Sequence, residues 1–188
     1  IQVNTDGLTV MVPRSQRDSV DVTRGVWEVK TRLQLEEAVY ERMFIRDVNN
    51  YIAAYENGKV KRKGAYESDQ DWHQNHGGLV IAKVTERVLV HGAPIRETVE
   101  QWPDIMDFML RTKVPRSSYL QWGEDQAQNI SRYYIAKGGK PLFKWMPPLK
   151  GKTEWRKIAV ESGWGVQVCN DIADAGKLPI EFEWYIQE

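Results

Sequence analysis

Residues 1–10 read IQVNTDGLTV, two apolar segments on either side of the polar sequence Asn4-Thr5-Asp6-Gly7. Asparagine, aspartate and glycine adopt the backbone angles of tight turns, so the stretch predicts a strand–turn–strand hairpin. A carboxylate at such a turn is held by two strands while it faces solvent or a ligand. Asp6 is therefore either an ordinary turn residue, the commoner case for this pattern, or an acid placed to bind a metal ion.

The segment resembles motif C of family B DNA polymerases, which is commonly an Asp-Thr-Asp-Ser turn between two strands of the palm domain. The second aspartate of that motif is a principal ligand of the catalytic Mg²⁺ ions, and Asp6 stands at its position. Asn4 replaces the first aspartate and Gly7 replaces the serine, so the match covers part of the motif.

Residues 46–67 extend the resemblance. The sequence RDVNNYIAAY at 46–55 is similar to the family's basic-basic-x-Tyr segment, although two asparagines stand where the family has lysines. ENGK and KGAYE, which follow it, resemble the family's Asp-Gly-Lys hairpin and Lys-Gly-x-Glu end. The family holds the backbone of the primer-template duplex with this region. The resemblance therefore implies DNA-binding roles for the matching residues, which are Arg46, Tyr51, Lys59, Lys61, Lys63 and Gly64.

The closest likeness is to polymerases of tailed bacteriophages. It predicts an α+β protein in which a partial palm, made of antiparallel hairpins and a packed helix, is followed by a helical and small-β thumb-like unit. We place the palm portion at residues 1–67, a polar linker at 68–78 and the thumb-like domain at 79–188.

Local patterns predict the elements of the first domain. Residues 15–30 are expected to form a helix with Ser15 as its N-cap, and a strand is expected at 40–45. Residues 51–66 form the clearest hairpin of the sequence. Its Asn57-Gly58 pair is typical of a type I′ turn, in which both central residues have positive φ.

The second domain is predicted to begin with two helices and to continue with short strands. Apolar spacing predicts a helix over 79–90 that ends at His91-Gly92, and a second helix from Pro94 towards Leu110 that Pro103 kinks. Its Met and aromatic residues indicate core. The strands after Val114 are expected at 119–122, 130–136, 142–145, 166–168 and 180–185.

Charge is balanced overall, with 26 Lys and Arg against 26 Asp and Glu, so net charge gives no evidence about nucleic acid. Its distribution is uneven, because residues 59–63 carry four positive charges. Alternation places Lys59, Lys61 and Lys63 on one face of a strand, which is either a protected sheet edge or a phosphate-binding face.

A second basic stretch, residues 137–157, has seven Lys and Arg against Glu154 alone. Trp145, Trp155 and Trp164 lie in or near it. Aromatic rings among lysines can stack on bases, but buried anchors of a small module are the more common use of tryptophan.

The single cysteine, Cys169, excludes an internal disulfide and a thiolate zinc cluster, and its apolar neighbours indicate a buried strand position. No apolar run approaches the length of a membrane span. We expect no membrane partner, a reducing compartment, and the host-cell cytoplasm if a phage encodes the protein.

The resemblance implies template-directed attack of a primer 3′-hydroxyl on a deoxynucleoside triphosphate, with two Mg²⁺ ions held by carboxylates that include Asp6. The family's motif A carboxylate and motif B helix have no counterpart in the 188 residues. We therefore expect the C-terminal portion of a DNA polymerase, inactive alone, whose partners are primer-template DNA and the upstream remainder of the enzyme. The alternative is a non-catalytic module that binds nucleic acid or protein.

Overall fold

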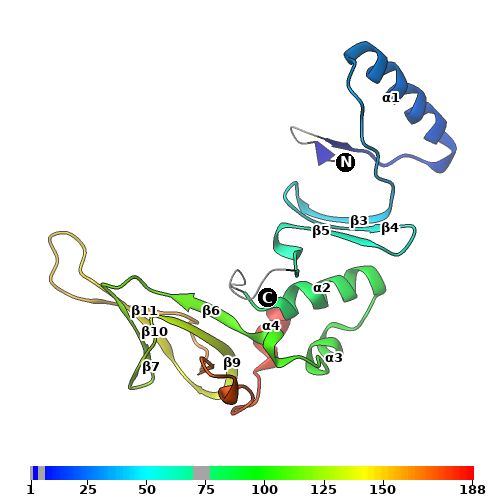
Figure 1. The fold of residues 1–188 in the computed structure, drawn as a ribbon. Coiled ribbons are helices and arrows are strands. Elements are labelled where there is room, and N and C mark those ends of the chain that lie inside the picture. The colour runs from blue at the N-terminus through cyan, green and yellow to red at the C-terminus, as the bar shows by residue number, and fades with distance from the viewer. Residues whose placement is uncertain (1, 4–6, 70–76) are drawn as a thin grey trace. The chain divides into compact units, whose positions relative to one another are not determined.

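The computed structural model describes residues 2–3, 7–69 and 77–188. It divides into two compact units, Ile1–Tyr66 and Glu67–Glu188, which are described separately (Figure 1). Helices and antiparallel sheets occur in both, which confirms the α+β class. The predicted linker 68–78 belongs to the start of the second unit, and its residues 70–76 lie outside the described part.

The first unit contains a short strand pair, one long helix and a three-stranded antiparallel sheet in the order β3-β4-β5. Its elements are β1 Gln2–Val3, β2 Leu8–Thr9, η1 Arg14–Gln16, α1 Arg17–Thr31, β3 Tyr40–Asp47, β4 Asn50–Tyr55, β5 Val60–Lys63 and η2 Gly64–Tyr66.

Strands β1 and β2 pair as the opening sequence predicts, with Gln2 opposite Thr9 and Val3 opposite Leu8. Residues 4–6, which include Asp6, lie outside the described residues.

Helix α1 confirms the helix predicted over 15–30. It begins after a 3₁₀ turn, and Gln16 occupies the N-cap without a side-chain bond, so the assignment of Ser15 as N-cap is wrong. Polar contacts fasten the helix to the segment that follows it. Glu37 pairs with both Arg17 and Arg24, and the Glu28 carboxylate accepts a hydrogen bond of 2.8 Å from the backbone N–H of Leu35. None of the helix residues is buried.

The hairpin of β4 and β5 is confirmed, but its turn differs from the prediction. Gly58 has a φ of 79°, and among described residues other than glycine only Arg32 has positive φ, so the type I′ turn is wrong. Gly58 N–H donates to the Tyr55 carbonyl and Tyr55 N–H to the Lys59 carbonyl, which closes a three-residue loop with glycine in the left-handed position. The Asn57 side chain accepts from Lys59 N–H at 3.0 Å.

The second unit packs helices against two small antiparallel sheets, β12-β9-β6 and β11-β10-β7-β8. Its elements are α2 Leu79–His91, α3 Ile95–Glu100, η3 Ile105–Phe108, β6 Leu110–Lys113, β7 Tyr119–Trp122, β8 Asp125–Ala127, β9 Ile130–Lys140, β10 Leu142–Met146, β11 Arg156–Ala159, β12 Val166–Val168, η4 Ile172–Asp174 and α4 Phe182–Gln187.

Helix α2 matches its prediction and ends at Gly92. The second predicted helix is wrong beyond its first turns. Proline at 103 cannot donate to a helix and obstructs the preceding turn, so α3 ends at Glu100 and Leu110 already begins β6. The Met and aromatic stripe is nevertheless core, since Phe108 and Met109 are buried.

The strands predicted at 119–122 and 166–168 coincide with β7 and β12, and those at 130–136 and 142–145 are the first parts of β9 and β10. Three strands were not predicted, namely β6, β8 and β11. Cys169 is buried, as predicted, but it lies directly after β12 and not within a strand, and burial raises the pKa of its thiol.

The strand predicted at 180–185 is wrong. Only Ile180 forms a β-bridge, to Ala136, and the chain then turns into α4. The side chain of Tyr185 in α4 is buried in this packing. Its hydroxyl donates to the Phe108 carbonyl at 2.8 Å and accepts from the Ile135 N–H at 3.0 Å, and its ring meets Phe108 edge-on.

A second set of contacts among the helices of this unit centres on the buried carboxylate of Asp107. Asp107 accepts from the Lys83 ammonium at 2.8 Å and from the indole N–H of Trp102 at 2.8 Å. These contacts join α2 to η3, and the Arg87 guanidinium lies 4.4 Å above the Trp102 ring. A buried charge needs this many partners to be tolerated.

We expect Tyr185→Phe to destabilise the second unit by about 1–3 kcal/mol, because it leaves the buried Ile135 N–H without an acceptor. Urea unfolding followed by tryptophan fluorescence measures the change. Tyr119→Phe is the matched control, since the Tyr119 side chain is only partly buried. Equal unfolding midpoints for the two variants would contradict the role of the Tyr185 hydroxyl.

Glu161 makes stability depend on pH. It accepts a 2.6 Å hydrogen bond from the Tyr133 hydroxyl, and burial raises the pKa of the carboxyl more than this bond lowers it. A folded-state pKa above the unfolded value means that protonation stabilises the fold. This stabilisation is fully present below the ordinary pKa of 4.5 and is lost as pH rises through the raised pKa.

We therefore expect the difference in unfolding free energy between wild type and Glu161→Gln to change with pH above 4.5. The amide still accepts from Tyr133 and has no charge to lose, so wild type should weaken relative to the variant as pH rises. Urea midpoints measured at several pH values test this, and parallel profiles for the two proteins would refute it.

Candidate nucleic-acid interface

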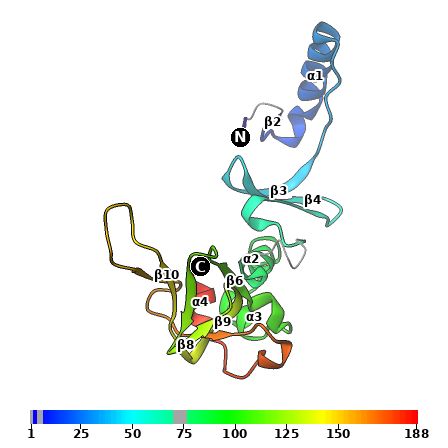
Figure 2. The same cartoon turned by 60° about the vertical axis from the view of Figure 1, so that its left-hand side comes forward.

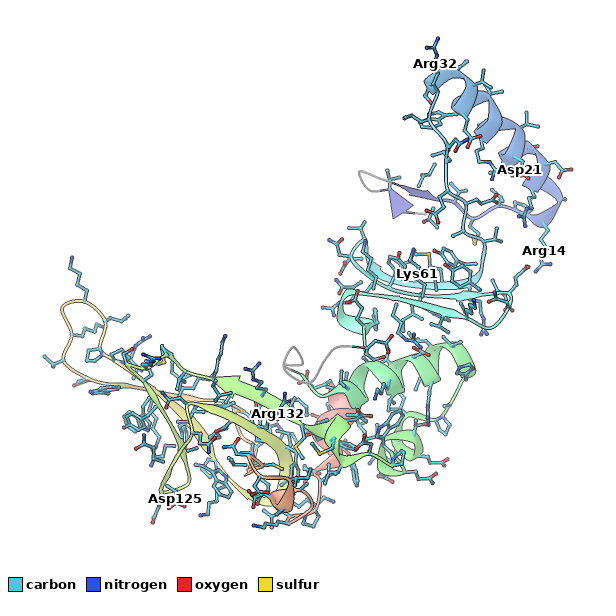
Figure 3. The ribbon with its side chains drawn as sticks, viewed as in Figure 1. Arg14, Asp21, Arg32, Lys61, Asp125 and Arg132 are labelled. Atoms are coloured by element: carbon cyan, nitrogen blue, oxygen red, sulfur yellow. The ribbon has the colours of Figure 1, made fainter. Side chains whose placement is uncertain are left out.

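The register of the β3-β4-β5 sheet places lysines and tyrosines on one face. Lys61 lies opposite Ala53 and Lys63 opposite Tyr51. Tyr55, two residues beyond Ala53, lies opposite Tyr40 of β3. Since cross-strand partners share a face of a sheet, these residues form what we call the lysine–tyrosine face, which consists of Tyr40, Tyr51, Tyr55, Lys61 and Lys63. Of these, Lys61 is labelled in Figure 3.

Aromatic contacts order this face. The rings of Tyr40 and Tyr55 are 4.8 Å apart, and the Lys63 ammonium lies 5.9 Å from the centre of the Tyr51 ring. Tyr51 is only 8% exposed. The rings therefore serve as a floor on which the lysine stems lie, while the exposed Lys61 keeps its ammonium accessible.

Lys61 remains a cation in this setting. Partial burial lowers the pKa of its ammonium, but the neighbouring hydroxyls of Tyr40 and Tyr51 outweigh that effect and the net pKa is raised. The pKa of Tyr40 is raised by burial and by a hydrogen bond with Tyr55, and the positive charge of Lys61 offsets part of this rise. The face is positively charged near neutral pH and can bind phosphate.

The remaining predicted DNA-binding residues are at two ends of the sheet. Arg46 is exposed beside an irregularity in β3, near the end where Tyr51 and Lys63 pair. Lys59 is exposed in the opposite turn, about 13 Å from Lys63 at the rise of an extended strand. The structure thus brings Arg46 and Lys63 to one end and leaves Lys59 at the other.

Gly64 has a structural reason to be glycine. Its φ is 66°, and a Cβ there would overlap the backbone oxygen of Asn49 and Oδ1 of Asn50. Asn50 is itself a clamp, since its Oδ1 accepts from Ala65 N–H at 2.7 Å and its amide donates to the Asp47 carboxylate. Hydrogen bonds from Asn50 and Asn49 lower the pKa of Asp47. A DNA-binding role for Gly64 stays a prediction from the resemblance.

The predicted metal ligand, Asp6, lies outside the described residues, as noted above. Within residues 2–3, 7–69 and 77–188, no group of three or more His, Cys, Asp or Glu side chains is close enough together to hold a metal ion. The two Mg²⁺ ions therefore stay a prediction from the resemblance, and the described residues supply no donor set for them.

The second unit has an open cavity of about 490 Å³. Its two carboxylates are each in an ion pair. Asp125, labelled in Figure 3, lies 3.3 Å from the Lys140 ammonium, and Asp174 lies 2.5 Å from that of Lys177. We assign this cavity no catalytic role.

Neither a protein-family model nor a curated protein matches the chain. Among the helices in the described part of the chain, none has both the length and the apolar character needed to cross a membrane.

Two tyrosines of the lysine–tyrosine face, Tyr40 and Tyr55, were missed by the sequence interpretation. Tyr55 could have been found, because the alternation that groups Lys61 with Lys63 also groups Tyr51 with Tyr55. Tyr40 could not, since its register depends on an irregularity in β3 between Tyr40 and Arg42.

We expect the double variant K61A/K63A to weaken binding of duplex DNA equally for all sequences. Each lost phosphate contact reduces the slope of log affinity against log salt by about 0.9, so the slope should flatten by almost two. Fluorescence anisotropy of a labelled duplex at several salt concentrations gives the slope.

The control is R42A/R62A, which removes the same charge from the opposite face of the sheet, where Arg62 lies opposite Ile52 and Arg42 opposite Ala54. It should change the slope less. Equal flattening by both double variants would show that net charge, and not the lysine–tyrosine face, governs binding.

Proposed function

We propose that the chain is the C-terminal palm and thumb portion of a family B-like DNA polymerase of the phage type, which acts in the host-cell cytoplasm. In this proposal the first unit belongs to the palm and the second to the thumb. The substrates are primer-template DNA and deoxynucleoside triphosphates, and the upstream remainder of the enzyme is its partner.

One observation carries the proposal. The turn sequence Asn4-Thr5-Asp6-Gly7 is flanked by the paired strands β1 and β2, and the same unit contains a sheet with lysines aligned on one face. A nucleotidyl-transfer site needs carboxylates near a surface that fixes the nucleic-acid backbone. The order of these two features along the chain is that of the family's motifs.

The exposed apolar side chains of the first unit support the proposal that another part of the enzyme packs against them. Neither Val3 nor any of residues 7–50 is buried. Val29 of α1 is 81% exposed, and Val22, Leu33 and Met11 are exposed as well. A helix in a folded protein buries an apolar stripe against another element, which the upstream part of a palm would provide.

In the proposed enzyme, Lys61 and Lys63 hold phosphates of the duplex and Tyr51 keeps Lys63 in place. Asp6 supplies one carboxylate of the site. A second carboxylate has to come from the upstream partner, so the chain alone should not extend primers. The reaction itself joins the primer 3′-oxygen to the α-phosphorus and releases pyrophosphate.

A non-catalytic nucleic-acid-binding module is the second candidate. The observation that favours it is the lysine–tyrosine face itself, whose lysines can bind backbone phosphates without a metal ion. The lysine–tyrosine face serves both functions, so the two candidates differ only in the role of Asp6.

Asp6→Asn in the complete polymerase tests the role of Asp6. We expect primer extension to be abolished, because an amide cannot replace an anionic metal ligand, while affinity for primer-template DNA stays about the same. Asp18→Asn, at an exposed position of α1, is the control and should extend primers like wild type. Extension by Asp6→Asn within about tenfold of wild type would favour the non-catalytic module.

A further inference from the structure

The outward face of the β11-β10-β7-β8 sheet carries aromatic rings. Trp145 of β10 lies opposite Tyr119 of β7 and opposite Lys157 of β11, so the three share one face. Their sequence neighbours belong to the other face, where Leu120 and Leu142 are buried in the core. The side with Trp145 is therefore the one turned away from the core.

Three rings at the loop end of this sheet are in contact. The ring of Tyr119 stacks on that of Trp145, with centres 5.9 Å apart and planes 13° apart. Trp155, just before β11, lies 5.8 Å from Tyr119 and is 46% exposed. The indole N–H of Trp145 donates to Oε1 of Gln121 at 2.6 Å, which fixes that ring. The rings are pre-oriented, and Trp155 remains accessible.

One lysine lies against these rings, and two more stand in the loop that precedes Trp155. The Lys157 ammonium lies 4.1 Å from the centre of the Phe143 ring and 5.4 Å from that of Trp145. Lys150 and Lys152 are exposed in the long loop between β10 and β11, which Figure 1 and Figure 2 show projecting from the sheet. A turn in which Lys152 N–H donates to the Leu149 carbonyl shapes the tip of this loop.

We propose that this face, made of Tyr119, Trp145, Trp155, Lys150, Lys152 and Lys157, binds single-stranded nucleic acid. An unpaired base stacks on Trp155 and Tyr119, and the lysines bind the adjoining phosphates. Base-paired nucleic acid hides its base faces inside the duplex, so exposed rings select single strands. The positive charge of Lys150, Lys152 and Lys157 is complementary to the phosphate backbone of a single strand.

This proposal does not depend on the polymerase function, and its test removes the first unit's contribution. The full chain with K61A/K63A is titrated with fluorescein-labelled dT12, and anisotropy gives the affinity. Adding W155A should weaken binding about tenfold, since stacking contributes this much per base. W155F keeps a ring and should retain most of the affinity.

Trp27→Ala is the matched control, because Trp27 is 40% exposed in the first unit. It should leave dT12 binding unchanged, and W155A should leave the affinity for a duplex of equal length unchanged. The thermal melting temperature of each variant shows whether the protein remains folded.

The lysines are tested by salt dependence. K150Q/K152Q should flatten the salt slope of dT12 binding by about 1.4, at roughly 0.7 per phosphate contact with a single strand. K113Q/K137Q, at exposed positions elsewhere in the unit, is the control and should flatten it less. Unchanged dT12 affinity in W155A, or equal losses for duplex and dT12, would overturn the proposal and leave a protein as the partner of this face.

Discussion

The arrangement of the second unit depends on two hydrogen bonds made by the hydroxyl of Tyr185. It donates to Phe108 and accepts from Ile135, residues 77 and 50 positions away in the sequence. One side chain thus satisfies a buried carbonyl and a buried amide that secondary structure leaves unpaired, each of which would otherwise cost about 1–3 kcal/mol. The six-residue helix that carries it, α4, is too short to be stable alone. Its position follows from this tertiary contact.

The same dependence explains where sequence patterns succeed and fail. Helices α1 and α2 are predictable, because their periodicity extends over several turns and glycine or a left-handed residue ends them. Residues 180–185 are rich in aromatic and β-branched residues, which favours a strand, but the pairing of Tyr185 with Phe108 and Ile135 selects a helix. That pairing leaves no trace in the local sequence. The prediction of a type I′ turn at Asn57-Gly58 is wrong for a local reason. The Asn57 side chain accepts a hydrogen bond from the Lys59 N–H, and of the two turn residues only Gly58 has positive φ.

The candidate site was predictable to the extent that it follows from alternation along single strands. Lys61, Lys63 and Tyr51 could be grouped from β4 and β5 alone. The clamp formed by Asn50 could not, because its carboxamide joins the β3–β4 turn to Ala65, fifteen residues later. Because of that clamp, residue 64 has to be glycine, since a Cβ there would overlap the backbone oxygen of Asn49 and the side chain of Asn50. This steric requirement explains Gly64 without reference to the family motif that it resembles.

Both units combine aromatic rings with lysines, yet the exposure of the rings separates their chemistry. On the lysine–tyrosine face Tyr51 is almost fully buried and lies beneath Lys63, so the ring supports a cation and has little surface left for a base. Such a face binds backbone phosphates and does not distinguish paired from unpaired nucleic-acid strands. On the second unit's face the Trp155 ring is accessible, and its neighbours are held by stacking and by Gln121. A ring with a free surface discriminates between paired and unpaired bases. The two faces should therefore respond differently to salt and to strand pairing, as expected when one is limited to charge and the other adds stacking.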